Sequence, residues 1–142
     1  MLKIVLGLFL IAHGLIHFSL TTVPGPQAGG LRTPFWPAWW RTDASSSWLV
    51  ASLGLDSGLV RSLGGLLVVA ATVGFVAAGL GLLGVPLLHE WWVPLAVGSA
   101  VVSMPLFILF GHPWLVVGAA LDILIAATLL WPNSFVVGIE SR

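Results

Sequence analysis

Apolar residues fill four long stretches of the chain, and polar segments of unequal length separate them. The stretches cover residues 2–20, 59–83, 91–110 and 113–131. A helix of about 20 residues crosses the roughly 30 Å of hydrocarbon in a bilayer, so each stretch is long enough to span it. The pattern predicts an all-α fold, a four-helix transmembrane bundle that forms one integral membrane domain over residues 1–142.

Residues 21–58 form the one long connection, between the first and second predicted helices. Trp36, Trp39 and Trp40 lie in its central, proline-containing part. Indole rings favour the headgroup region of a bilayer, so we expect this Trp-rich loop to lie in the membrane interface. Two interpretations remain open: a linker that follows the membrane surface, or a lid that the three tryptophans form over the mouth of the bundle.

Residues with strong preferences for helix ends support these boundaries. Asp56 or Ser57 is suited to cap the second helix, and Pro113 suits the first position of the fourth. Asp43 can cap a short helix within the loop, over Ala44 to Leu53. The first stretch has no clean cleavage site after it, so we expect it to be retained as a helix rather than removed as a signal peptide.

Four further tryptophans lie at the ends of the predicted spans, and none lies inside a span. They are Trp91, Trp92, Trp114 and Trp131. This is the placement that an aromatic belt at each membrane surface requires. We therefore expect these four indole rings to lie at headgroup level.

Ionisable side chains within the spans are the strongest indication of function. Asp122 is the only charged residue in the fourth stretch, and His13 and His17 lie four residues apart on one face of the first. A carboxylate at that depth costs several kcal/mol unless it faces the protein interior and finds a partner. At a rise of about 1.5 Å per residue, Ser103 and His112 lie on the same side of the midplane as both histidines. We expect these residues to line one polar vestibule.

Small residues surround the fourth-helix carboxylate. Gly118, Ala119 and Ala126 share a helical face with Asp122, and Gly14 lies beside His13. Small side chains let membrane helices approach closely. We expect close helix contacts at both places.

Several chemistries fit this set of polar residues. Two histidines at i and i+4 with a carboxylate are a metal-ligand set for Zn, Fe, Cu or Ni, in which His13, His17, His112 and Asp122 would be the ligands. A b-type haem between His17 and His112 is a further possibility, although the sequence demands neither cofactor. Without a metal, the same residues suit a proton relay or a quinone-facing site. In the structural interpretation, they only hold helices together.

Composition excludes other classes of function. Hydrophobic residues make up 58% of the chain and charged residues 7%, a balance that only a bilayer accommodates. Basic and acidic residues number five each, which leaves no surface for nucleic acid. Cysteine is absent, so disulfides, thiolate metal sites and thiol redox chemistry are excluded.

The segment Gly7-Leu-Phe-Leu-Ile-Ala-His13-Gly14-Leu-Ile-His17 resembles the first helix of DoxX-like membrane proteins, and Leu63-Gly-Gly-Leu resembles their glycine-rich second helix. The resemblance implies a bacterial inner-membrane protein of four spans, in a family that includes a subunit associated with thiosulfate:quinone oxidation. The chain departs from the family where a glutamate is expected before the paired glycines, since Arg61-Ser62-Leu63 stands there.

Partners and orientation follow from the same pattern. We expect the lipid bilayer to be a partner, and the pattern also allows a membrane protein partner or a second copy of the chain. We expect a multi-pass protein of the cell inner membrane with cytoplasmic termini, because Lys3 flanks the first span. The main alternative to a site-bearing protein is a non-catalytic accessory subunit of a larger membrane complex. The sequence leaves open whether the protein is an enzyme.

Overall fold

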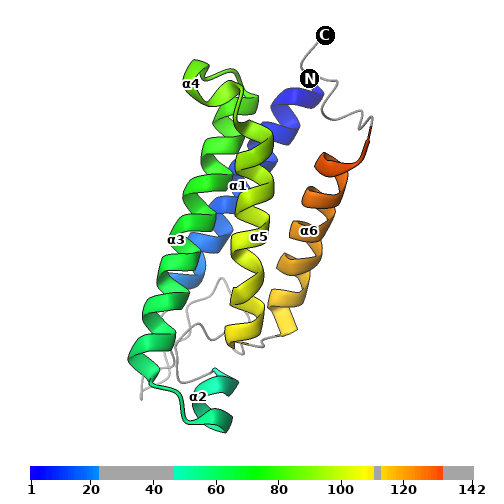
Figure 1. The fold of residues 1–142 in the computed structure, drawn as a ribbon. Helices are drawn as coiled ribbons and strands as arrows, with labels where there is room; N and C mark the ends of the chain where they lie inside the picture. Colours follow the sequence, from blue (N-terminus) through cyan, green and yellow to red (C-terminus); the bar gives the residue numbers. More distant parts are fainter. Residues whose placement is uncertain (23–46, 111–112, 133–142) are drawn as a thin grey trace, which may run out of the picture.

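The computed structural model describes residues 1–22, 47–110 and 113–132, and every regular element in these ranges is a helix. The helices, shown in Figure 1, are α1 (Leu2–Thr22), α2 (Trp48–Leu53), α3 (Ser57–Leu82), α4 (Pro86–His89), α5 (Trp92–Phe110) and α6 (Pro113–Leu130). The prediction of an all-α fold is confirmed for this part of the chain. The predicted loop lid, Trp36, Trp39 and Trp40, lies outside the described residues, as do Asp43 and His112.

Three of these helices are long and apolar enough to cross a membrane: Leu2–Ser19 of α1, Ser57–Leu82 of α3 and Trp92–Phe110 of α5. They suggest a membrane-embedded protein. The fourth long helix, α6, is apolar over Leu115–Leu130 but shorter in that part. The ends of α1, α3, α5 and α6 lie within two residues of the predicted ranges.

The long helices are arranged around α3 and α5. Helix α3 packs against α1 on one side and against α5 on another, and α6 packs against α5 (Figure 1). The two short helices lie at opposite ends, with α4 beside the end of α3 and α2 beside the end of α5. Polar groups of α1, α5 and α6 can therefore meet between these helices.

Side chains fix both ends of α3. Asp56 is its N-cap, and its carboxylate accepts a hydrogen bond from the backbone N–H of Leu59 at 2.7 Å, which confirms one of the two predicted caps. At the other end, Nδ1 of His89 donates to the carbonyl of Gly81 at 3.1 Å. The helix that carries His89, α4, is absent from the sequence prediction. It begins at Pro86, a residue suited to a first helical position.

The core lies between α3, α5 and the neighbouring faces of α1 and α6, and Trp92 is its largest fully buried side chain. The other members are Leu10, Phe75, Ala78, Leu82, Ala96, Ala100 and Leu129. Trp92 is the first residue of α5, and its ring packs inside the protein, so its predicted position at headgroup level stays a prediction. Trp91 and Trp131 are exposed, as an interfacial indole should be.

Glycines bring α1 and α3 into close contact. A Cβ atom added at Gly79 would lie 2.6 Å from the carbonyl oxygen of Gly7, and one at Gly14 would lie 2.9 Å from Cβ of Phe75. Real Cβ atoms do not approach this closely, so only glycine fits. The expected close approach at Gly118 is wrong, since a Cβ there would meet nothing within 4 Å.

Candidate functional site

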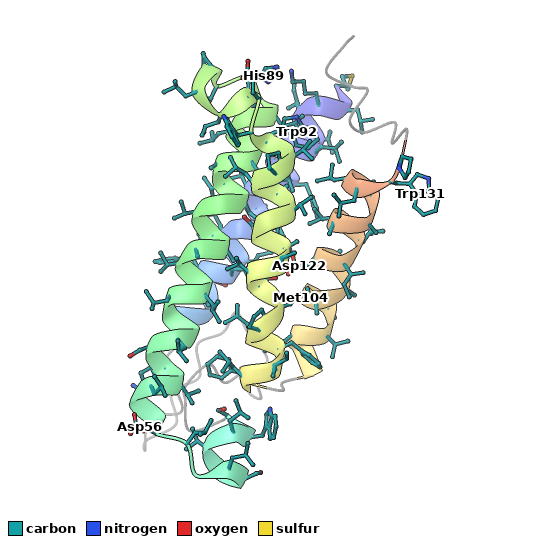
Figure 2. The ribbon with its side chains drawn as sticks, viewed as in Figure 1. Asp56, His89, Trp92, Met104, Asp122 and Trp131 are labelled. Atoms are coloured by element: carbon teal, nitrogen blue, oxygen red, sulfur yellow. The ribbon has the colours of Figure 1, made fainter. Side chains whose placement is uncertain are left out.

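Four of the buried polar residues in the described ranges gather at Asp122. Asp122 is 1% exposed, and Figure 2 labels it at mid-height, between α5 and α6. His13 and His17, from α1, are 4% and 7% exposed, and Ser103 reaches the same point from α5. Three helices thus each contribute to one polar cluster, which we call the His–Asp cluster: His13, His17, Ser103 and Asp122.

Both carboxylate oxygens of Asp122 are engaged from different helices. Nε2 of His13 lies 2.7 Å from Oδ1, a hydrogen bond that joins α1 to α6. The hydroxyl of Ser103 is hydrogen-bonded to Oδ2 and also lies 2.8 Å from the carbonyl oxygen of Ala100. This satisfies the condition under which a carboxylate is tolerated at such depth.

His17 completes the cluster and has a defined tautomer. Its Nδ1 lies 3.0 Å from the backbone carbonyl oxygen of His13, one turn earlier in α1. A carbonyl only accepts, so Nδ1 carries the proton in this contact. When the ring is neutral, Nε2 therefore has a lone pair, and it lies 3.7 Å from Oδ2 of Asp122. That distance is too long for a direct hydrogen bond.

Aromatic rings enclose the two imidazoles. Phe75 of α3 meets the His13 ring edge-on at a centroid distance of 4.8 Å and lies 5.6 Å from the His17 ring. Phe9, one turn before His13, stacks on the His13 ring at 5.9 Å. Apolar walls lower the local dielectric constant, which strengthens the hydrogen bonds inside the cluster and makes an unpaired charge costly.

The donor set is also suitable for a cation. His13, His17 and Asp122 each offer one ligand atom, and these atoms lie within 4.8 Å of one another. Two imidazole nitrogens and a carboxylate oxygen suit Zn or Fe among the common metals. The hydrogen bond from Nδ1 of His17 to a backbone carbonyl is the support that metal-binding histidines usually have.

The structure brings together four of the predicted site residues, the members of the His–Asp cluster. The fifth, His112, lies outside the described residues, so its predicted place in the vestibule and among metal ligands stays a prediction. Phe75 and Phe9 were missed by the sequence reasoning. Phe9 could have been found from its spacing of one helical turn to His13, whereas nothing in the sequence relates Phe75 to α1.

No protein-family model, curated protein or solved structure matches the chain. Its class therefore rests on its own architecture. Over the described ranges it is all-helical, with three helices able to cross a membrane and a buried cluster of His13, His17 and Asp122.

Proposed function

We propose that the chain is a four-span membrane protein in which the His–Asp cluster exchanges protons within the bilayer. One observation carries the proposal. The two oxygens of Asp122 are held by groups on two other helices, His13 and Ser103, and each of these groups can donate or accept a hydrogen bond. A structural link needs hydrogen bonds to both oxygens as well, but proton exchange also needs a partner that can hold the proton, and the imidazole of His13 is such a partner.

The arrangement lets a proton change position while the heavy atoms stay in place. A proton between His13 and Asp122 gives either an imidazolium with a carboxylate or a neutral imidazole with a carboxylic acid, and both keep the 2.7 Å contact. When Oδ2 is protonated, it donates to Ser103, whose hydroxyl then donates to Ala100. When Asp122 is ionised, the Ser103 hydroxyl turns and donates to Oδ2 instead.

The position of α6 supports four spans rather than three. Its 18 residues extend over about 27 Å, close to the hydrocarbon thickness of a bilayer. It runs alongside α5 (Figure 1) and carries Asp122 inward, with Ile123 and Leu124 exposed on its outer side. An apolar outer face is what contact with lipid requires.

Infrared spectroscopy of the carboxyl groups tests proton exchange directly. In protein reconstituted in bilayers, we expect a buried carboxyl band that appears and disappears reversibly with pH and is lost in Asp122→Asn. The matched control is Asp56→Asn, which changes the exposed cap of α3 and should leave that band in place. A spectrum without any titrating buried carboxyl, over the whole pH range in which the protein stays folded, would contradict the proposal.

A second candidate function, metal binding, is favoured by the orientation of His17. Its Nε2 points to Asp122 without forming a hydrogen bond, so this lone pair is available to an ion that Asp122 and His13 can also reach. Elemental mass spectrometry of the purified protein should find near-stoichiometric metal that His17→Ala and Asp122→Ala both lose. His89→Ala, a histidine at the far end of α3, should keep it. Absence of metal from the unmodified protein would exclude this candidate.

The finer predictions from the sequence remain part of this proposal. The resemblance of the first two helices to DoxX-like proteins supports a bacterial inner-membrane location, but Arg61-Ser62-Leu63 in place of the expected glutamate argues against carrying over the family's quinone-linked chemistry. A haem would depend on His112. The alternative, an accessory subunit of a larger complex, predicts a protein that aggregates when purified alone, whereas a site-bearing protein should give a single defined species in size-exclusion chromatography.

A further inference from the structure

An apolar cleft of about 170 Å³ lies between α1 and α6, next to the His–Asp cluster but separate from it. Its walls come from α1, α3, α5 and α6: Leu6, Phe9, Leu10, Leu82, Trp92, Leu121, Leu124, Ile125, Thr128 and Leu129. Phe9 and Leu124 are 41% and 61% exposed, so the cleft reaches the outer surface of the helices. In a bilayer it would open toward the lipid.

The size and lining of the cleft define what it can hold. Apolar cavities of about 150 Å³ stay dry and take up benzene-sized apolar groups. The α6 wall runs from Leu121 to Leu129, which corresponds to about 12 Å along the helix axis. An apolar space of this volume that opens within the hydrocarbon fits a segment of one lipid hydrocarbon chain.

The headgroup of such a lipid has a candidate partner, Lys3, on the face of α1 that carries Leu6 and Leu10. Lys3, Leu6, Leu10 and His13 follow one another at intervals of three or four residues, so they form one stripe along α1. Lys3 stands at the end of this stripe nearest the membrane surface. It is partly buried, and no carboxylate in the described ranges pairs with it. A phosphate at headgroup level would be its natural counter-ion.

Trp92 provides an additional indication. It lines the cleft, and its buried indole N–H has no hydrogen-bond partner among the described residues. An unpaired buried donor is costly, and indole N–H groups near a membrane surface commonly bond lipid carbonyl or headgroup oxygens. Because this nitrogen is buried, an ester carbonyl of a lipid in the cleft would supply the missing acceptor only after the ring turns toward the cleft.

We propose that the cleft between α1 and α6 is a binding site for one phospholipid, with an acyl chain along Leu6 and Leu10 and the phosphate at Lys3. The chain would lie against Phe9, whose ring stacks on His13. A bound lipid would therefore restrict the motion of the Phe9 ring, which lies between the hydrocarbon and the His–Asp cluster. This site does not depend on proton exchange by Asp122.

Photo-crosslinking in bilayer nanodiscs tests the proposal. The probe is phosphatidylglycerol with a diazirine on one acyl chain, and labelled residues are mapped by mass spectrometry. We expect labels to concentrate on the cleft walls, several-fold above exposed positions such as Leu8 and Val117. Thr128→Phe fills the cleft and should reduce this labelling several-fold. Ala127→Phe adds the same ring at an exposed position outside the cleft and should leave labelling unchanged.

A second comparison tests the headgroup contact. Lys3→Gln should lower cleft labelling by phosphatidylglycerol several-fold but not labelling by a diacylglycerol with the same diazirine chain. Equal labelling of cleft and outer positions, insensitive to Thr128→Phe, would overturn the proposal. If labelling by both probes falls equally in Lys3→Gln, the phosphate contact would be wrong. The carboxyl infrared signal of Asp122 is measured separately, so either proposal can fail alone.

Discussion

Helix α1 meets its neighbours in two different ways. Against α3 it forms a close seam, where Gly7, Gly14 and Gly79 allow backbones to touch. Toward α6 it leaves an apolar cleft, and the described polar contacts across that gap come from His13 and His17 to Asp122. A seam of glycines has no room for adjustment, whereas a hydrogen bond beside a cleft can break and form again. We therefore expect the contact between α1 and α3 to be rigid and the distance between α1 and α6 to be adjustable.

Breaking the seam should have the largest effect. In Gly79→Leu, the new side chain would collide with the carbonyl of Gly7 and with Ile11, and neither backbone can move without separating α1 from α3. Forced overpacking costs typically about 1–3 kcal/mol, and contact with backbone puts this case at about 3 kcal/mol. Thermal unfolding in detergent should show a large fall in Tm.

The control for the seam is Gly98→Leu. A Cβ at Gly98 meets nothing within 4 Å, so this variant adds the same side chain to a spanning helix without a collision. Its Tm should stay near that of the unmodified protein. Equal losses in both variants would show that the seam has no special role.

Removing the Asp122 carboxylate, which joins α6 to α1, should have a smaller effect on stability but a larger effect on the distance between these two helices. In Asp122→Asn, the charge is lost but one hydrogen bond to His13 or Ser103 can persist, so we expect a loss of about 1 kcal/mol. The distribution of distances between α1 and α6 should become broader. Spin labels on cysteines introduced at Leu8 and Val117 measure it, and the chain has no native cysteine to interfere.

The same pair of labels in Asp56→Asn provides the reference, because Asp56 caps α3 and lies outside the gap. A distance distribution that broadens only in Asp122→Asn locates the effect at the bridge. An unchanged distribution in both variants would mean that packing through α5 alone positions α6.

Trimming the cleft wall should have the smallest effect on stability. Phe9→Ala removes a ring that is 41% exposed toward the proposed lipid, and moving an apolar ring between lipid and protein gains little, so the loss in unfolding free energy should be below about 1 kcal/mol. The main effect should be a greater exposure of the His13 ring to the hydrocarbon. Dissolved oxygen, a paramagnetic probe that concentrates in hydrocarbon, should broaden the NMR signal of the His13 ring more than in the unmodified protein. Leu8→Ala, on the outer face of α1, should not change it.

The sequence predicted the helices and the members of the His–Asp cluster better than it predicted how the helices meet. Apolar runs and the Asp56 cap define where helices begin and end, and a lone buried carboxylate points to its histidines. Helices in a bilayer are apolar all round, so hydrophobic periodicity does not tell which faces meet. Gly118 was therefore expected at a close contact that the structure leaves open, and the burial of the Trp92 ring in the core was not foreseen.

The hydrogen bond between His13 and Asp122 joins residues 109 positions apart, so α1 receives this partner only after α3 and α5 have been synthesised. On biological insertion scales, an Asp at the centre of a helix costs roughly 3 kcal/mol, and each Leu, Ile or Val returns about 0.3–0.6. The nine such residues of α6 thus offset its carboxylate by only a small margin. In the proposed four-span arrangement, α6 should therefore insert only weakly until it contacts α1, and the His13–Asp122 contact would stabilise that insertion.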